Sequence, residues 1–590
     1  MIYNYHTEYR NWLTDPVVDD ATKAELKNIA DDQKEIEDRF YKDLEFGTGG
    51  LRGILGAGTN RLNIYTIRKA TQGLANYILS SDVYKEGMAV AIAHDCRRMS
   101  PEFSIETALV LNANGIKTYT FDSLRPTPLL SFAVRHLGCV AGIVITASHN
   151  PPEYNGYKVY WSDGGQCTSP RDKEIMQEVQ NVNSFAMVKT MLLAEAKTQK
   201  LFNIAPASVD DTFIAKVKAR CFNCGIIPDS DIKVVFTPLH GAGNVSVQRA
   251  LGEIGFKNVY VVKEQEQPDG NFPTVKYPNP EEIKAFSYAI NLAKEKDADI
   301  VLATDPDCDR VGVAVKHDNE YILLTGNQTG VILLEYLITQ MQTRGKLPSN
   351  GAVISTIVST DMARIITEAN GLTYIDVLTG FKYIGEKIKQ FEEIGNHEFI
   401  FGFEESYGYL ADTYARDKDA VGATVLICEA AAYYRKQGLS LYAMLQKLYE
   451  KYGMFYESME SITLKGVDGV ENIKKIMANL RQAPPQSLAN SEVIEVRDYL
   501  HGTITKRRPI SWSIKKPTTE VEQTAPTMLP VSDVLYFASL DGSWACVRPS
   551  GTEPKIKIYF GVRLPSDSSQ QEVQDKLSKV ITSMMALINR

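Results

Sequence analysis

A serine in a short polar loop is the first position at which this chain could bind a substrate covalently. Residues 146–151 read Thr-Ala-Ser-His-Asn-Pro and directly follow the apolar run 142–145. Ligands of open α/β sheets gather at the carboxyl ends of strands, and an Asn-Pro pair favours a turn that would expose Ser148 there. Ser148 is therefore a candidate nucleophile. The alternative is a Ser/Asn loop that only caps the next helix.

Three aspartates alternate along a second loop. Asp305, Asp307 and Asp309 follow the apolar run 299–303, and Arg310 comes next. Alternating carboxylates on a turning loop can converge on one cation, and hard oxygen ligands suit Mg²⁺, which also accepts a phosphate oxygen. An EF-hand is excluded because no Gly stands at the sixth position and no Glu at the twelfth. The loop predicts a magnesium site, with a solvated acidic turn as the alternative.

Paired carboxylates follow a third strand-like run. Residues 402–409 read Gly-Phe-Glu-Glu-Ser-Tyr-Gly-Tyr, so Glu404, Glu405 and Ser406 stand together. Carboxylates accept hydrogen bonds from sugar hydroxyls and disfavour apolar analogues. The loop predicts a sugar-binding site. A helix N-terminus with acidic residues that favour the helix dipole is the alternative, and both interpretations can hold together.

A basic loop near the C-terminus is the fourth signal. Residues 548–555 read Arg-Pro-Ser-Gly-Thr-Glu-Pro-Lys between two strand-like runs. Arginine, small hydroxyl residues and backbone N–H groups in one tight loop can enclose a phosphate, and a plain hairpin loop is the alternative. No GxxxxGK[ST] occurs, and the Gly-rich stretch 47–53 does not fit GxGxxG, so the sequence disfavours a kinase or a dehydrogenase.

Short β-branched runs alternate with amphipathic segments along most of the chain, which predicts an α/β fold with mainly parallel strands. We expect strands at 88–92, 142–145, 232–236, 299–303 and 398–401, and helices at 280–296, 330–343 and 422–436. The tail differs, because three strand-like runs precede one terminal helix, and it predicts a smaller α+β domain. Candidate domain breaks are the polar stretch 180–208, the region near Asn327 and the stretch 453–491.

Bulk composition indicates a multidomain globular protein. The 590 residues are 44% hydrophobic and 23% charged, which is ordinary for such a chain. The net charge of −8 argues against a general nucleic-acid or anionic-membrane binder. No long apolar run or secretory leader is visible, so a cytoplasmic location is expected. Eight cysteines are too sparse for a disulfide scaffold, and we interpret Cys221 and Cys224 as a chance CxxC in a reduced chain rather than a zinc site.

The four loops occur in order as TASHNP, DPDCDR, GFEESYGY and RPSGTEPK, after FGTGGLRG at 46–53. This ordered set resembles the α-D-phosphohexomutase family, which includes phosphoglucomutases and phosphomannomutases. The length and the GFEESYGY variant are similar to the longer branch of the family, which includes phosphopentomutase-like members. The resemblance implies three similar α/β domains with mixed, mainly parallel sheets and a smaller C-terminal α+β domain around a central cleft. The expected domains carry the phosphoserine, metal, sugar-binding and phosphate-binding loops, at 1–205, 206–326, 327–455 and 456–590.

The resemblance also implies roles for individual residues. Ser148 would carry the phosphoryl group and would ligate Mg²⁺ together with Asp305, Asp307 and Asp309. The catalytic residues besides Ser148 would be His149, Lys158, Arg310 and Lys418. Substrate would be bound by Arg52, Thr379, Gly380, Lys382, Glu404, Ser406, Arg548, Ser550, Gly551 and Thr552, of which the last four would hold the phosphate that is not reacting.

The proton carrier departs from the family pattern. Some family members have a His after the sugar loop, where this chain has Tyr414. Lys418 is our first choice and His149 our second. A lysine can act as a base when burial and nearby cations lower its pKa.

The implied activity is reversible phosphoryl transfer between the 1- and 6-positions of a hexose phosphate, through a phosphoserine and a hexose 1,6-bisphosphate. Mg²⁺ would be the cofactor and a sugar 1,6-bisphosphate the activator. Alternatives are a phosphopentomutase, a sugar-bisphosphate synthase, a phosphatase and a non-catalytic sugar-phosphate sensor. The expected partner is a small sugar phosphate, with no nucleic acid and no membrane.

Overall fold

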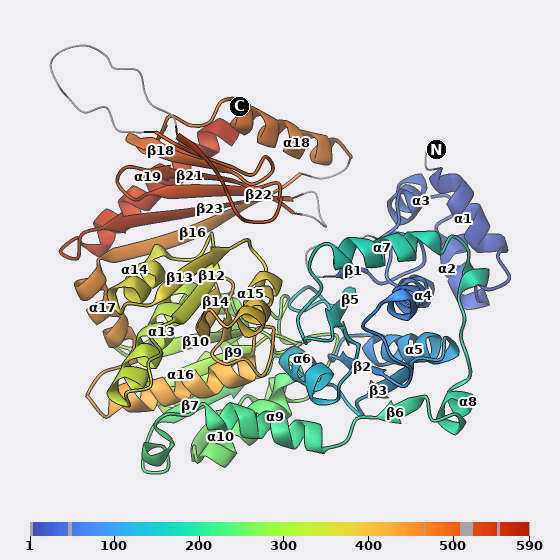
Figure 1. The fold of residues 1–590 in the computed structure, drawn as a ribbon, viewed down its shortest axis with the longest axis horizontal. Coiled ribbons are helices and arrows are strands. Elements are labelled where there is room, and N and C mark those ends of the chain that lie inside the picture. Colours follow the sequence, from blue (N-terminus) through green and yellow to red (C-terminus); the bar gives the residue numbers. More distant parts are fainter. Residues whose placement is uncertain (1–3, 45–49, 465–466, 508–522, 551–554, 589–590) are drawn as a thin grey trace. The chain divides into compact units, whose positions relative to one another are not determined.

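The computed structural model describes residues 4–44, 50–464, 467–507, 523–550 and 555–588, and Figure 1 shows the order of its elements along the chain. The chain divides into two compact units. Unit 1 comprises Met1–Thr329, Thr339–Ala352 and Gly380–Tyr442, and unit 2 comprises Gly330–Ile338, Val353–Thr379 and Ala443–Arg590. In the described part of the chain, no helix is both long and apolar enough to cross a bilayer.

Unit 1 begins with three short helices, α1 (Tyr5–Thr14), α2 (Asp20–Asn28) and α3 (Gln33–Phe40). Each has a side-chain N-cap, from Asn4, Asp19 and Asp32 respectively, which satisfies backbone N–H groups of the first turn. Their apolar faces form a small core around Trp12, to which Ala57 and Tyr65 also contribute.

The first sheet of unit 1 has the strand order β1-β5-β4-β2-β3-β6. Strands β4, β2, β3 and β6 are parallel, and β5 and β1 are antiparallel additions at the edge opposite β6. The strands are β1 (Leu51–Ile54), β2 (Ala89–His94), β3 (Lys117–Thr120), β4 (Ala141–Ile145), β5 (Tyr154–Trp161) and β6 (Phe202–Ile204). The helices are α4 (Ile64–Ser80), α5 (Ser100–Ala113), α6 (Thr127–His136), α7 (Arg171–Asn181) and α8 (Leu193–Thr198). Helix α4 packs against both α5 and α7.

The second sheet of unit 1 repeats this design with the order β11-β10-β9-β7-β8. Strands β9, β7 and β8 are parallel, and β10 and β11 are antiparallel additions. The strands are β7 (Lys233–Thr237), β8 (Asn258–Val261), β9 (Ile300–Thr304), β10 (Val311–His317) and β11 (Glu320–Leu323). The helices are α9 (Ser208–Ala219), α10 (Gly243–Ile254), α11 (Lys263–Glu266) and α12 (Ser287–Lys296).

A third α/β segment is shared between the two units. Its elements in unit 1 are α15 (Phe381–Ile394), β14 (Glu398–Glu404), β15 (Gly408–Leu410) and α16 (Ala420–Arg435). Those in unit 2 are α14 (Asp361–Ala369) and β13 (Thr373–Val377). The division runs through α13 (Gly326–Thr343), β12 (Gly351–Thr356) and α17 (Leu441–Tyr452).

The rest of unit 2 is an antiparallel sheet with the order β16-β23-β22-β21-β18-β19-β20, to which β17 adds beside β18. Its strands are β16 (Met454–Thr463), β17 (Ser487–Leu488), β18 (Ser491–Asp498), β19 (Thr503–Lys506), β20 (Gln523–Pro526), β21 (Leu535–Ser539), β22 (Trp544–Pro549) and β23 (Lys555–Leu564). Its helices are α18 (Val467–Gln482) and α19 (Gln570–Ile588). Purely antiparallel pairing here confirms the α+β character expected of the tail.

One local pattern recurs three times in unit 1. A strand that ends in a polar loop is followed by an antiparallel partner, at β4–β5, β9–β10 and β14–β15. The first loop contains Ser148, the second the three aspartates, and the third begins at Glu404 and contains Ser406. Each candidate loop therefore leaves and re-enters its sheet through adjacent strands, which fixes both of its ends.

The mainly parallel α/β fold is confirmed, and the strands expected from the apolar runs are β2, β4, β7, β9 and β14. The helix expected at 280–296 is shorter, because Asn279 first closes a separate turn with the N–H groups of Glu281 and Glu282. The stretches 180–208 and 453–491, given above as candidate domain breaks, contain α8 and β6, and β16 and α18, respectively.

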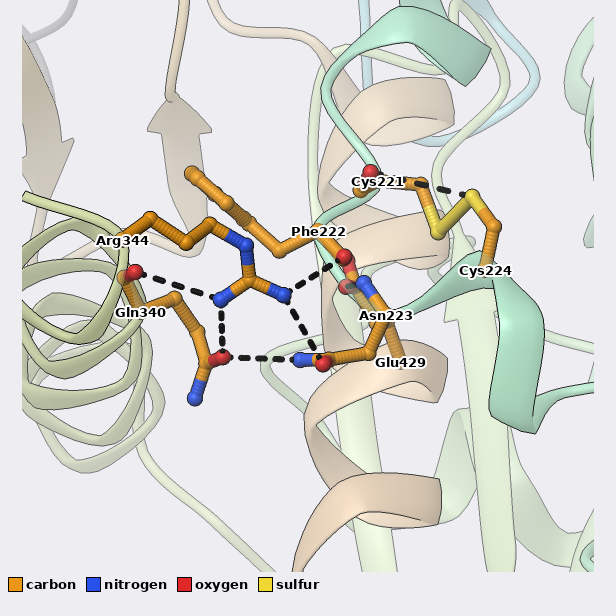
Figure 2. Close-up of a disulfide and its surroundings, with 7 residues drawn as sticks. All are labelled: Cys221, Phe222, Asn223, Cys224, Gln340, Arg344 and Glu429. Carbon is orange, nitrogen blue, oxygen red and sulfur yellow. Dashed lines mark hydrogen bonds between the residues drawn. A yellow bond between two sulfur atoms is a disulfide. The ribbon is translucent and has the colours of Figure 1, made fainter. Parts of the chain in front are cut away.

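The CxxC pair is joined, so the expectation of two unpaired thiols was wrong. Cys221 and Cys224 form a disulfide after α9, and Figure 2 shows the residues around it. Arg344, the C-cap of α13, donates to the carbonyl of Phe222 at 2.7 Å and to Asn223 Oδ1 at 3.0 Å. The remaining six cysteines are not disulfide-bonded: Cys96, Cys139, Cys167, Cys308, Cys428 and Cys546.

Candidate active site

The serine loop and the aspartate loop meet within unit 1. Ser148 Oγ donates a hydrogen bond of 2.7 Å to Asp305 Oδ2 and lies 3.1 Å from His149 Nδ1. Ser148 is 2% exposed and has φ of 52°, a left-handed conformation that is uncommon for serine. The carboxyl ends of β4 and β9 thus bring the candidate nucleophile against the candidate metal ligands.

The three aspartates form a buried cluster. One carboxylate oxygen from each residue lies within 4.8 Å of those from the other two. Asp305 Oδ1 accepts hydrogen bonds from the backbone N–H groups of Asp309 and Arg310, at 3.1 and 3.0 Å. Cys308 has φ of 53° in the same turn, which folds the loop back on itself. Backbone curvature, rather than sequence spacing alone, makes the alternating carboxylates converge.

This cluster fits a divalent cation. Asp307 Oδ1 and Asp309 Oδ1 are buried and have no hydrogen-bond partner, which is costly for carboxylate oxygens unless a cation is bound. Burial and the neighbouring Asp307 and Asp309 raise the pKa of Asp305 well above its ordinary value. Three all-oxygen ligands of this kind suit Mg²⁺.

Two lysines from other segments contact the same carboxylates, Lys158 from β5 and Lys418 from the segment before α16. Lys158 Nζ of β5 lies 2.8 Å from Asp307 Oδ2 and 3.2 Å from Asp309 Oδ2, and Lys418 Nζ lies 3.1 Å from Asp309 Oδ2. Burial opposes ionisation of Asp309, but Lys418, Lys158 and Arg310 outweigh it and lower its pKa. The two lysines contact the Oδ2 atoms, Arg310 Nε lies 3.8 Å from Asp309 Oδ1, and neither Oδ1 atom accepts a hydrogen bond.

Lys418 does not have the lowered pKa expected of a lysine base. Burial lowers it, but Asp309, Asp417 and Glu404 more than compensate, so the pKa is raised. Gly408 permits this position, because a Cβ there would lie 2.0 Å from Lys418 Cδ. The side chain is therefore a buried cation in this structure, able to donate a proton or to neutralise phosphate charge.

Arg310 is oriented by an ion pair with Glu281, a residue of the loop before α12. Burial lowers the pKa of Arg310, but Glu281, Asp309 and Asp305 together raise it. The guanidinium is thus a fixed positive charge beside the aspartate loop. Glu281 was not singled out from the sequence, because nothing local links it to Arg310.

The loop after β14, expected to bind the sugar, lies in the same unit. Glu404 Oε1 at the end of β14 accepts a hydrogen bond of 3.0 Å from the backbone N–H of Gly380. Burial raises the pKa of Glu404 to about 7, with Lys418 opposing and Glu405 adding to the rise. Lys382 Nζ lies 3.3 Å from Asp172 Oδ2 of α7. A buried carboxyl that titrates near neutrality is a common feature of functional sites.

The other expected site residues divide into two groups. Arg52 of β1 donates to Asn150 Oδ1 at 3.0 Å and so reaches the serine loop. Thr379, Arg548 and Ser550 belong to unit 2. The N–H of Ser550 donates to the carbonyl of Lys555 at 2.7 Å, which closes the loop between β22 and β23. Gly551 and Thr552 lie outside the described residues, as does most of FGTGGLRG, residues 46–49.

Several residues around the loops were missed by sequence reasoning. Thr127 at the start of α6 holds the aspartate loop, with its hydroxyl on Asp307 Oδ2 at 3.0 Å and its N–H on the Asp307 carbonyl at 2.9 Å. Asp95 and Arg97 follow β2 and contact the serine loop. The signal that could have revealed these two is their place directly after a buried strand.

Known sequences match this chain over most of its length. Family models of phosphoglucomutase/phosphomannomutase match its α/β/α domain I at residues 43–185, domain II at 211–319, domain III at 325–452 and the C-terminal domain at 505–580. A phosphoglucomutase of Staphylococcus aureus (strain MRSA252) is 36% identical over 567 residues, 95% of this chain and 97% of that protein. The phosphoglucomutase of strain N315 is 36% identical over 570 residues, 96% and 98% of the two chains.

Solved structures share the fold at low sequence identity. A phosphoglucomutase/phosphomannomutase family protein from Burkholderia thailandensis has a TM-score of 0.64 at 18% identity and covers 92% of this chain and 97% of its own. The exocytosis-sensitive phosphoprotein parafusin (a phosphoglucomutase) from Paramecium, in its open form, has a TM-score of 0.67 at 16% identity and covers 93% and 96%.

Proposed function

Because this chain belongs to the phosphoglucomutase/phosphomannomutase family of phosphosugar mutases, we propose that it interconverts hexose 1-phosphate and hexose 6-phosphate through a phosphoserine at Ser148. The observation that carries this proposal is the 2.7 Å hydrogen bond from Ser148 Oγ to Asp305 Oδ2, which joins the candidate nucleophile to the carboxylate cluster. A serine that merely capped a helix would have no reason to lie there.

The proposed reaction has two transfers. In the first, the phosphorus–Oγ bond of phosphoserine breaks and a phosphorus–oxygen bond forms to the free hydroxyl of the sugar phosphate, whose proton passes to a basic group. The resulting hexose 1,6-bisphosphate turns over and returns its other phosphoryl group to Ser148 Oγ, and the departing sugar oxygen takes a proton. Such transfers need alignment and charge neutralisation more than covalent help.

The residues of unit 1 supply that neutralisation. Asp305, Asp307 and Asp309 would hold Mg²⁺, which when bound neutralises charge on the transferring phosphoryl group. Arg310, Lys158 and Lys418 add fixed positive charge at the same place. Lys418 and His149 remain the proposed proton carriers, and the raised pKa of Lys418 favours its use as a proton donor.

We propose different residues for contacts with the sugar hydroxyls, with the reacting end of the sugar and with its other phosphate. Glu404 and Ser406 would accept and donate hydrogen bonds with its hydroxyls, together with Thr379, Gly380 and Lys382 of the third α/β segment. Arg52 would bind near the reacting end. The loop of Arg548, Ser550, Gly551 and Thr552 would hold the phosphate that is not reacting. A sugar 1,6-bisphosphate would act as activator by phosphorylating Ser148. The proposed domain boundaries remain 1–205, 206–326, 327–455 and 456–590.

The test is a side-by-side assay of purified protein with glucose 1-phosphate, mannose 1-phosphate and ribose 1-phosphate, each with Mg²⁺ and a bisphosphate activator. Formation of hexose 6-phosphate, abolished in Ser148→Ala, would support the proposal. Release of inorganic phosphate at the rate of sugar-phosphate loss would instead indicate a phosphatase. Binding without turnover would indicate a sensor.

A further inference from the structure

Arg97 forms hydrogen bonds with several backbone carbonyls in and beside the serine loop. It has no role in the mechanism proposed above or in the roles implied by the family resemblance. Its side chain is 1% exposed. Nη1 donates to the carbonyls of Pro151 and Tyr154 at 2.8 and 3.0 Å, and Nη2 donates to those of Ser148, at 2.6 Å, and Asn150. One guanidinium therefore hydrogen-bonds to backbone carbonyls at Ser148 and on the segment that follows it, up to Tyr154.

Asp95 fixes Arg97 and reaches the same loop by a second route. Its Oδ2 lies 3.3 Å from Arg97 Nε and accepts a hydrogen bond of 2.6 Å from Thr146 Oγ1. Thr146 Oγ1 in turn accepts one of 2.8 Å from the backbone N–H of Ser148. The two backbone polar groups of Ser148 are thus both held by this network, the N–H through Thr146 and the carbonyl by Arg97.

The network holds Ser148 in a conformation that serine would otherwise leave. Its φ of 52° is left-handed, where the Cβ of a residue other than glycine is crowded. Relaxation of φ would swing Oγ away from Asp305, 2.7 Å from it in the structure. The position of the nucleophile therefore depends on contacts to backbone atoms rather than to Oγ itself.

A residue from the part of unit 1 that contains the second sheet also contacts the Arg97 guanidinium. The ring centroid of Phe272 lies 5.0 Å from the guanidinium. The loop of Phe272 is tied to the aspartate loop through its neighbours, since Asp269 N–H donates to the His240 carbonyl at 3.3 Å and Ala242 N–H to the Pro306 carbonyl at 2.8 Å. Gly241 allows this approach, because a Cβ there would lie 2.5 Å from Pro306 Cα.

We propose that Arg97, held by Asp95 and stacked on Phe272, is a positioning residue that aligns Ser148 with the aspartate loop for phosphoryl transfer. This inference rests on the proposed mutase function. Arg97 touches no reacting atom and acts through the backbone of Ser148. Misalignment of about 1 Å at a reacting atom can cost about a hundredfold in rate.

The experiment compares Arg97→Lys with Arg61→Lys. Lysine keeps the positive charge beside Asp95 but cannot donate to four carbonyls, and Arg61 is a buried arginine that pairs with Asp38 away from the loop. The measurements are kcat and KM for glucose 1-phosphate, the Mg²⁺ concentration for half-maximal rate, the thermal midpoint, and single-turnover transfer from isolated phosphoenzyme to glucose 6-phosphate and to water. We expect Arg97→Lys to lower kcat and the transfer rate to sugar about tenfold to a hundredfold. Half-maximal Mg²⁺ and KM should stay within about twofold, and Arg61→Lys should match wild type.

A second pair keeps the inference testable if Arg97→Lys does not fold. Thr146→Val keeps the shape of threonine but removes the hydroxyl between Asp95 and the N–H of Ser148, whereas Thr146→Ser keeps that hydroxyl. We expect the valine variant to lose transfer to sugar relative to water and the serine variant to recover it. The inference is overturned if both variants transfer at the wild-type rate, or if activity per folded molecule is unchanged in Arg97→Lys. A wild-type enzyme without phosphoserine or mutase turnover would instead refute the proposed function itself.

Discussion

At the scale of single residues, the position of Ser148 can be tested most directly. We expect purified wild-type protein to carry one phosphate on a fraction of molecules, mapped to Ser148. Ser148→Ala should lose both this phosphate and mutase turnover, because no other side chain would store the phosphoryl group. Intact mass, peptide mapping and a coupled glucose 6-phosphate assay measure these outcomes. The exposed Ser123→Ala is the control, and near-normal turnover in Ser148→Ala would contradict the covalent mechanism.

The carboxylate cluster is tested by a change that preserves shape. Asp307→Asn keeps an oxygen for Thr127 but removes the charge that a divalent cation needs, so we expect kcat to fall by about a hundredfold or more. Chelation of wild-type enzyme should abolish turnover and Mg²⁺ should restore it. The exposed Asp211→Asn serves as the control. A full rate in excess chelator would rule out the metal.

The pH dependence of the sugar loop follows from Glu404. Its pKa in the folded chain is about 7, above the ordinary value for glutamate, because the carboxylate is buried. Because the folded pKa is raised, the contribution of this carboxyl to the free energy of unfolding is fully present below its unfolded pKa and is lost as pH rises to about 7, by on the order of 3 kcal/mol. Chemical denaturation at pH 5 and pH 8 should show this loss in wild type. It should be absent in Glu404→Gln.

Ionisation of Glu404 should also affect the kinetics: stability falls as the pH rises, but kcat/KM should increase. The ionised carboxylate accepts hydrogen bonds from sugar hydroxyls, so we expect kcat/KM for glucose 1-phosphate to rise as pH increases through about 7. Glu404→Gln should flatten that part of the profile and lower its plateau. A profile that Glu404→Gln leaves unchanged would assign the titration to another group.

At the scale of elements, the loop between β22 and β23 separates binding from structure. Arg548→Ala should weaken binding of sugar phosphate and release more bisphosphate into solution, about tenfold to a hundredfold, because a charged hydrogen bond is lost. Arg563 of the neighbouring β23 stacks on Phe455, so Arg563→Ala is the matched control. A drop in thermal stability with normal kinetics would favour a plain hairpin.

The local sequence predicted where the loops lie in the chain, but it did not predict the contacts between the loops. Apolar β-branched runs located β4, β9 and β14, and the polar residues after them identified the loops, because strand ends and turn residues are encoded locally. The convergence of Lys158 on Asp307 depends on pairing between distant strands, which no local pattern specifies. The raised pKa of Lys418 could not be predicted for the same reason, since Asp309, which contacts it, follows a strand of another sheet.

At the scale of the whole molecule, the two compact units could not be read from the sequence. The division passes through β12, α13 and α17, so two continuous helices and one strand are each divided between two units. Patterns of hydrophobicity report helices and strands but not which contacts between distant segments are most numerous. The division into α/β segments followed by an antiparallel tail was nevertheless predicted, because it depends on the order of elements alone.

Substrate choice is a property of the whole molecule, because both ends of the sugar must be bound. We expect a higher kcat/KM for glucose 1-phosphate than for ribose 1-phosphate, by roughly tenfold or more. The carboxylates and hydroxyl of Glu404, Glu405 and Ser406 can engage adjacent hydroxyls of a pyranose, and a furanose would leave part of this set unpaired. Both substrates are assayed at one activator concentration. A preference for ribose 1-phosphate would identify a phosphopentomutase and leave the mutase mechanism intact.

The cysteines outside the disulfide can be used to measure local opening of the protein. Buried thiols lie beside the first sheet (Cys139), in the aspartate loop (Cys308), in α16 (Cys428) and in β22 of unit 2 (Cys546). A thiol reagent can modify each only when its surroundings open, so labelling followed by mass mapping times the opening of each region separately. Cys308 is the most informative, because protection of this thiol by added Mg²⁺ would report metal binding without any assay of turnover.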